Sequence, residues 1–148
     1  MKIFLGLVCV IFGGVGWIGQ LISGINFQLA QRWGLQEKSC GTDPLFRRAE
    51  KNAARWDSFV LWTLMAAGIL MLIDNSWWPF LSLLAGGIYL DGAGREGAKY
   101  LSLHREGVRI GTSRDLMRDA IFFTAMAVIS LWTMIYALWF ITTKLNLI

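Results

Sequence analysis

Residues 58–90, SFVLWTLMAAGILMLIDNSWWPFLSLLAGGIYL, decide the fold: one charged residue, Asp74, separates two uncharged runs of 16 residues. The polar Asp74-Asn75-Ser76 stretch suits a tight turn, and Pro79 is tolerated in a first helical turn. This stretch therefore predicts a tight helical hairpin. Each arm covers about 24 Å of a hydrocarbon core some 30 Å thick. The arms cross the membrane if tryptophans extend them into the interface; the alternative is a hairpin that dips in and returns.

Two longer uncharged runs, residues 3–31 and 120–143, lie on either side of this hairpin. Charged residues make up only 16% of the chain, whereas soluble domains carry roughly 25%. This composition excludes a disordered chain, a disulfide scaffold and a soluble nucleic-acid-binding protein. It predicts an all-α, integral membrane four-helix bundle in one domain, residues 1–148. We expect spans at about 3–25, 57–74, 77–92 and 118–142.

The first run is expected to be retained as a span. It is longer than the apolar region of a typical signal peptide, and no A-x-A cleavage site follows it. The two cysteines, Cys9 and Cys40, form no CxxC motif and are expected to be unpaired thiols.

The basic residues predict the orientation of the spans. Six Lys or Arg residues lie between the first and second runs, six lie between the third and fourth, and none lies in the hairpin turn. Loops rich in Lys and Arg stay in the cytoplasm. We therefore expect segments 26–56 and 93–117 to be cytoplasmic and both termini to lie outside, with a bacterial inner membrane as the expected location.

Both cytoplasmic segments are expected to contain extensions of the spanning helices. Asp43 followed by Pro44 predicts a helix start, and the helix is expected to continue to about residue 73. The third helix is expected to run to about Glu106, and residues 112–115, TSRD, predict a capping box that opens the fourth. The first extension is amphipathic. Its basic residues are expected to contact anionic headgroups: Arg47, Arg48, Lys51 and Arg55.

Small residues predict where the helices pack closely. Residues 14–19 match the dinucleotide fingerprint G-x-G-x-x-G, but that motif requires a strand before it and here it lies within a membrane run. We interpret it as part of a packing face, because small residues let membrane helices approach one another. The predicted packing residues are Gly13, Gly16, Gly19, Ser23, Gly86, Gly87, Ala93 and Gly97.

The fourth span presents two faces. One is small and weakly polar and is expected to pack on the bundle: Ala120, Thr124, Ala127, Ser130 and Ala137. The other is bulky and is expected to face lipid or a partner: Met126, Ile129, Trp132, Tyr136 and Trp139.

Candidate chemistry is concentrated where the spans meet the cytoplasm. The chain has one histidine, and its cysteines and histidine show no zinc spacing, so no cofactor is expected from ligand counting. The charged residues at the predicted rim are Asp57, Asp91, Arg95, Glu96, Lys99, Asp115 and Asp119. Two interpretations remain open: ion pairs that fix the register of the helices, and a site for a metal or an anionic headgroup.

Part of this rim resembles the signature of the CDP-alcohol phosphotransferases. Residues 91–95, DGAGR, and residues 111–119, GTSRDLMRD, are similar to D-x-x-D-G-x-x-A-R and G-x-x-x-D-x-x-x-D. The resemblance implies that these aspartates hold Mg²⁺, which binds a nucleotide diphosphate at the cytoplasmic ends of two membrane helices. The chain departs from the pattern: Ile88 replaces the first aspartate, Arg95 comes one residue early, and the two halves are 15 residues apart.

Two classes of function remain open. The expected function is a small multi-pass membrane protein that self-associates or serves as an accessory subunit of a membrane complex, without a catalytic set. The alternative is a membrane enzyme or transporter that uses the rim carboxylates, with Mg²⁺ as its metal. The expected partners are the lipid bilayer, anionic headgroups, and copies of the chain or other membrane subunits, and not nucleic acid.

Overall fold

The described part of the chain is helical. The computed structural model describes residues 1–38 and 41–144, and no strand occurs among them beyond one isolated bridge between Thr42 and Ile110. The helices are α1 (Lys2–Ile25), α2 (Phe27–Arg32), α3 (Pro44–Val60), α4 (Trp62–Leu72), α5 (Trp78–Arg105) and α6 (Ser113–Lys144). Three stretches are long and apolar enough to cross a membrane: Lys2–Ile25, Pro44–Leu72 and Ser113–Lys144. The predicted all-α class is confirmed for the described residues, with three stretches that could cross a membrane by length and composition; the four-helix bundle stays a prediction.

The predicted helix boundaries in the connecting segments are confirmed. The Asp43 side chain accepts a hydrogen bond from the Leu45 amide at 2.8 Å and caps α3, with Pro44 as its first residue. The Thr112 hydroxyl accepts from the Asp115 amide, while Asp115 accepts from the Thr112 amide at 3.0 Å, which completes the capping box of α6. Helix α5 ends before Gly107, whose φ of 73° suits a glycine after a helix.

The helix predicted from Pro44 to about residue 73 is confirmed as one stretch, Pro44–Leu72, which is divided into α3 and α4 at Leu61. Leu61 keeps a helical backbone, with φ −73° and ψ −12°, and its amide donates to the Asp57 carbonyl at 2.8 Å. At this point the Tyr89 hydroxyl of α5 donates a hydrogen bond to the Leu61 carbonyl at 2.8 Å. A buried tyrosine hydroxyl requires an acceptor, and the backbone carbonyl of Leu61 supplies it.

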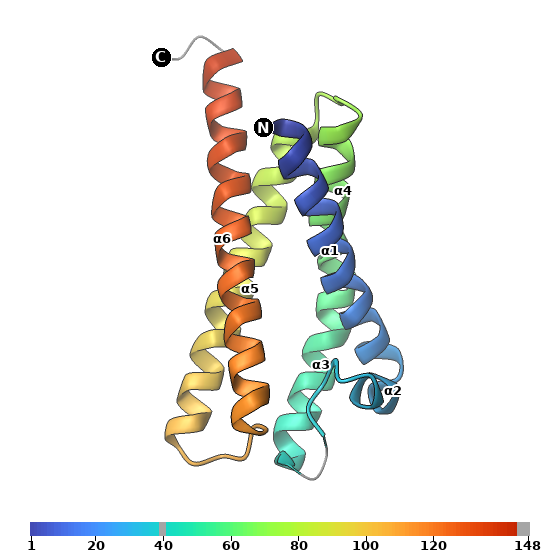
Figure 1. The fold of residues 1–148 in the computed structure, drawn as a ribbon, viewed down its shortest axis with the longest axis vertical. Coiled ribbons are helices and arrows are strands. Elements are labelled where there is room, and N and C mark those ends of the chain that lie inside the picture. The colour runs from blue at the N-terminus through green and yellow to red at the C-terminus, as the bar shows by residue number, and fades with distance from the viewer. Residues whose placement is uncertain (39–40, 145–148) are drawn as a thin grey trace.

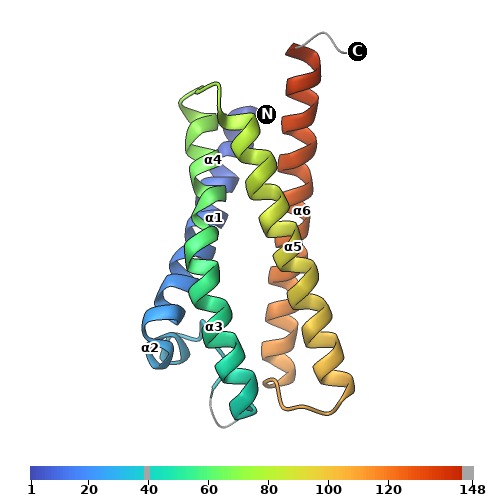
Figure 2. The same ribbon diagram turned by 180° about the vertical axis from the view of Figure 1, so that it is seen from behind.

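The helices form two units that meet at one end (Figures 1 and 2). Helix α1 packs along α3 and α4, α5 packs along α6, and α4 contacts α5 next to the turn at residues 73–77. We call this the turn end; Lys2 at the start of α1 forms an ion pair with Asp74 there. We call the opposite end, with residues 33–38, 41–43 and 106–112, the loop end. The two units diverge toward it.

Glycines bring α1 and α4 into close contact. A Cβ at Gly13 would lie 2.6 Å from the Met65 amide nitrogen, and a Cβ at Gly68 would lie 2.6 Å from the Gly6 carbonyl oxygen. Real Cβ atoms do not approach backbone this closely, so both positions require glycine. Cys9 is also buried in this contact, where it is a free thiol whose sulfur lies 3.4 Å from the Thr133 hydroxyl; Cys40 lies outside the described residues.

The predicted assignment of the two faces of α6 is correct only in part. Ser130 and Ala137 are fully buried and Trp139 is 56% exposed, as predicted. Met126 and Tyr136 of the predicted outward face are only 5% and 8% exposed, whereas Ala120 and Thr124 of the predicted packing face are exposed. For Met126 the physical reason is a glycine of α5: a Cβ at Gly92 would lie 3.1 Å from its terminal methyl carbon. Met126 therefore fills space that Gly92 leaves on α5, whereas Tyr136 is buried by stacking on Trp78, with ring centroids 5.6 Å apart.

Candidate functional site

A cleft of about 710 Å³ lies between the α1/α3 side and the α5/α6 pair, toward the loop end. Its walls are mostly aliphatic and aromatic and include Val15, Leu84, Ile88, Phe122 and Met126. Its charged lining includes residues of α3, α5 and α6 together with Glu37 of the segment that follows α2. The cleft is therefore amphipathic, with long apolar walls and a charged margin.

The first charged network joins α3 to α5 across the cleft. The Lys99 ammonium lies 2.6 Å from a Glu50 carboxylate oxygen and also contacts Glu96. The Arg95 guanidinium lies 3.8 Å from Asp57, with Asp91 and Glu96 at 3.9 and 4.0 Å. Glu50 is only 8% exposed, so its ion pair with Lys99 offsets the cost of burying the carboxylate.

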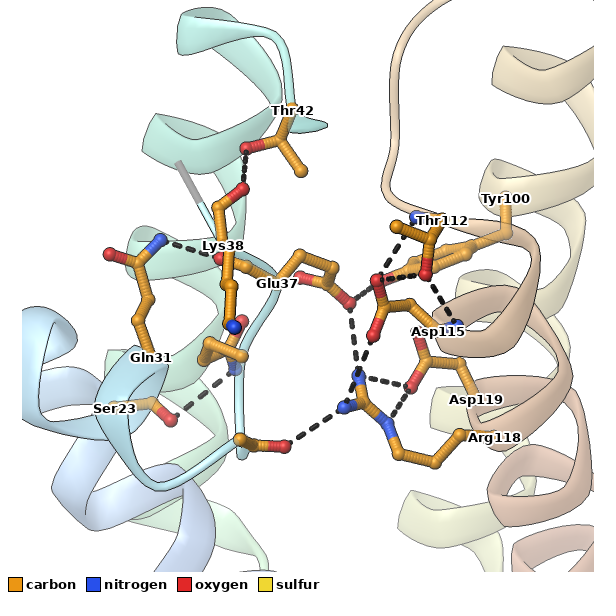
Figure 3. A network of polar contacts seen from close by, with 12 residues as sticks. Ser23, Gln31, Glu37, Lys38, Thr42, Tyr100, Thr112, Asp115, Arg118 and Asp119 are labelled. Carbon is orange, nitrogen blue, oxygen red and sulfur yellow. Dashed lines mark hydrogen bonds and ion pairs between the residues drawn. The ribbon is translucent and has the colours of Figure 1, made fainter. Parts of the chain in front are cut away.

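The second network is centred on Arg118 of α6 (Figure 3). Its guanidinium donates to the Gly34 carbonyl at 2.9 Å and to Asp119 at 2.9 Å. The same group lies 3.5 Å from Glu37 and 3.6 Å from Asp115. One arginine therefore ties the segment after α2 to the start of α6.

Hydrogen bonds also hold the segment that carries Glu37, residues 33–38, in place. The Gln31 side chain donates to the Glu37 carbonyl at 2.6 Å, and the Gln36 side chain donates to the Ser23 hydroxyl at 3.3 Å. At the edge of the loop end, the Asp43 amide donates to the Arg109 carbonyl at 2.7 Å. The first two bonds hold the segment against α2 and α1, and the third joins residues 41–43 to the loop between α5 and α6.

Glu37 is the most perturbed carboxyl group of the second network. It is 5% exposed and accepts a hydrogen bond from the Tyr100 hydroxyl at 3.2 Å. Burial, followed by a hydrogen bond with the Asp119 side chain and the charge of that group, raises the pKa of Glu37 from 4.5 to about 8. Burial and the nearby carboxylates of Glu50 and Glu37 likewise raise the pKa of Tyr100. Glu37 is therefore protonated at neutral pH.

The structure brings most of the predicted rim residues to the cleft. Asp57, Asp91, Arg95, Glu96 and Asp119 line it, and Lys99 lies next to it through its contacts with Glu50 and Glu96. Asp115 lies apart as the partner of Thr112 in the capping box of α6.

Magnesium does not fit this arrangement of carboxylates. The site implied by the resemblance requires Asp91, Asp115 and Asp119 to converge. Asp91 pairs with Arg95, whereas Asp115 is held by Thr112 and Asp119 by Arg118. No group of three or more His, Cys, Asp or Glu side chains among the described residues could hold a metal ion.

The predicted small residues divide between packing positions and open positions. Gly13 and Gly86 are tightly packed, and Ser23 and Ala93 are buried. Gly16 lines the cleft, where a Cβ would lie 3.7 Å from the Tyr89 hydroxyl. A Cβ would meet no atom within 4 Å at the remaining three positions, of which the first two line the cleft: Gly19, Gly87 and Gly97.

The predicted headgroup-contact residues lie on α3 away from its buried face. That buried face is formed by Phe46, Glu50 and Ala54. Leu45 and Trp56 are exposed, as are Arg48 and Arg55, while Arg47 and Lys51 are half-buried.

Four residues that line the cleft were not predicted from the sequence as site residues: Glu37, Glu50, Tyr100 and Arg118. A signal existed for Glu50, because Phe46, Glu50 and Ala54 recur every four residues and Asp57 follows three residues later, so they share one face of a helix. Glu37 had no comparable signal, since it lies outside a helix and reaches the cleft only through long-range contacts.

Comparison of the chain with protein-family models, with curated proteins and with solved structures found no match.

Proposed function

We propose that the chain crosses a membrane four times, with α5 from Trp78 to about residue 92 as the additional crossing. No charged residue lies between Asp74 and Asp91, and Phe80 and Leu84 expose apolar side chains, each 57% exposed. The distribution of basic residues favours a loop end in the cytoplasm and both termini outside, in a bacterial inner membrane.

In this orientation the exposed Leu45 and Trp56 of α3 lie at the membrane interface. The four basic residues of α3 then contact anionic headgroups.

We propose further that the protein binds a small amphipathic molecule in the cleft. The main support for this proposal is the cleft itself. Its volume of about 710 Å³ falls among small-molecule sites, which are mostly apolar with a few polar groups that orient the ligand. Apolar walls suit a hydrocarbon tail, and the charged margin suits a polar head. This function is related to the alternative in which the protein uses the carboxylates at the cytoplasmic rim. Self-association and a role as an accessory subunit remain predictions.

Filling the cleft tests this function. Gly19 lines the cleft and a Cβ there meets nothing, so Gly19→Phe places a ring in the cleft without displacing a neighbouring helix. The matched control is Gly94→Phe, because Gly94 is equally open but does not line the cleft.

The measurement is calorimetric titration of each variant in phosphatidylcholine nanodiscs with 1-octanol and octyltrimethylammonium, with empty nanodiscs as the blank. We expect saturable binding to the wild type, about tenfold weaker binding to Gly19→Phe, and no change for Gly94→Phe. Binding indistinguishable from the blank, or equal binding by all three proteins, would contradict the proposed function.

A further inference from the structure

We infer that the cleft selects an amphipathic cation, a molecule with an alkylammonium or similar positive head and an apolar tail. This inference rests on the proposed function and adds the chemical class of the ligand.

The first argument is the local excess of acidic groups. Six carboxyl groups line the cleft and pair with three cations, Arg95, Lys99 and Arg118: Glu37, Glu50, Asp57, Asp91, Glu96 and Asp119. With Glu37 protonated, five carboxylates remain for the three cations.

The second argument is the contrast with the rest of the chain. The protein as a whole has a net charge of +4, yet Arg95 and Arg118 are the only Lys or Arg residues among the described ones that line the cleft. The basic residues therefore lie elsewhere, and the negative charge is concentrated where the ligand would enter. An excess of one sign in a site with apolar walls attracts the opposite charge and opposes a like charge more strongly than it would in water.

The third argument is the presence of aromatic rings beside these carboxylates. Trp56, Tyr100, Phe122 and Phe123 line the cleft. The protein already places a cation near one of these rings, because the Lys99 nitrogen lies 5.6 Å from the Tyr100 ring centroid. Ring faces attract ammonium groups and are neutral toward alkyl chains, so these walls accept both parts of an amphipathic cation.

The charge of the probe separates this inference from the proposed function. Wild-type protein in phosphatidylcholine nanodiscs is titrated with three probes that share an eight-carbon tail: octyltrimethylammonium, 1-octanol and octyl sulfate. Each titration is repeated with Gly19→Phe, so that only binding lost in this variant is assigned to the cleft. We expect the cation to bind at least about tenfold more tightly than the sulfate.

Replacing acidic residues of the cleft by neutral ones is expected to reduce the preference for the cation over the sulfate. Asp57→Asn and Glu50→Gln should each lower the cation-to-sulfate ratio about threefold or more. The matched control is Glu106→Gln, because Glu106 is exposed at the same end and does not line the cleft; its ratio should stay at the wild-type value. Thermal unfolding checks that each variant is folded, and having two acidic variants keeps the test decisive if one fails to fold.

The outcomes are distinct. If all three probes bind in the cleft with equal affinity, or if the sulfate binds best, the inference is overturned and the proposed function stands. If a preference for the cation is unchanged in both acidic variants, the margin does not cause it and the inference is likewise overturned. If no probe shows binding that Gly19→Phe abolishes, both fail.

Discussion

Glu37 shows how much a single side chain outside the helices contributes to this structure. It is buried, lies 3.5 Å from Arg118, and accepts a hydrogen bond from Tyr100. Through these contacts it connects the segment after α2 to both helices of the α5/α6 pair. Burial and Asp119 raise its pKa to about 8, so the folded protein keeps a proton that the unfolded chain releases near pH 4.5.

This difference makes stability fall as the pH rises. Between pH 4.5 and about 8 the folded state binds one more proton than the unfolded state. Each pH unit in that window therefore lowers the free energy of unfolding by up to about 1.4 kcal/mol. Above pH 8 the loss levels off. Glu37→Gln keeps the shape and removes the titration. We expect its thermal unfolding midpoint in detergent to match the wild type at pH 5 and to exceed it at pH 9.

The control for this prediction is Glu106→Gln, at an exposed position, which should follow the wild-type curve. Parallel curves for Glu37→Gln and the wild type between pH 5 and 9 would show that Glu37 does not titrate in this window.

At the scale of the elements, the contact between α1 and α4 depends on glycines that no other residue can replace. A Cβ at Gly68 would lie within 3 Å of three α1 atoms: the Gly6 oxygen, the Val10 nitrogen and the Cys9 Cβ. Backbone atoms in packed helices cannot move aside without separating the helices. Gly94 of α5, in contrast, is surrounded by open space.

Alanine substitutions should therefore have opposite effects. Gly13→Ala and Gly68→Ala are each expected to destabilise the protein by about 1–3 kcal/mol, because of overpacking against backbone. Gly94→Ala is expected to stabilise it by about 0.5–1 kcal/mol, because alanine favours the helix. Unfolding in a denaturing detergent mixture measures all three. A gain of stability at Gly13 or Gly68 would show that α1 and α4 are not in close contact.

The sequence predicted the helices better than it predicted their faces. Helix starts at Asp43 and Thr112 depend on neighbouring residues, so local patterns were sufficient. The packed face of α6 depends on the residues of α5 that it meets: Gly92 leaves room for Met126, and Trp78 stacks on Tyr136. Likewise, the pattern of small residues on α1 did not distinguish the packed Gly13 from the open Gly19, because one helix does not show where its partner lies.

At the scale of the whole molecule, the contested element is α5. By length and composition, α1, Pro44–Leu72 and α6 could cross a membrane, and our proposal adds α5 as a fourth crossing. The two topologies differ in where they place the end of α5. With four crossings the loop end is cytoplasmic throughout, whereas with three crossings residues 106–112 lie outside.

Cysteine labelling distinguishes these topologies. In a background with Cys9→Ser and Cys40→Ser, single cysteines are introduced by Ser76→Cys in the turn and Ser102→Cys near the end of α5, both exposed positions. We expect a membrane-impermeant maleimide to label the first on intact bacterial cells and the second only after permeabilisation. Labelling of both on intact cells would indicate that α5 does not cross.

The close contact of α1 with α4 also has a consequence for biosynthesis. Helix α1 is synthesised before α3 and α4. Its packing partners leave the ribosome later: residues 64–72, which fill its glycine-lined face, and Asp74, which pairs with Lys2. In a membrane, α1 must therefore wait with lipid against Gly6 and Gly13 until α4 is inserted, and only then can lipid be exchanged for helix. Close packing of α1 against α4 therefore follows the insertion of α4.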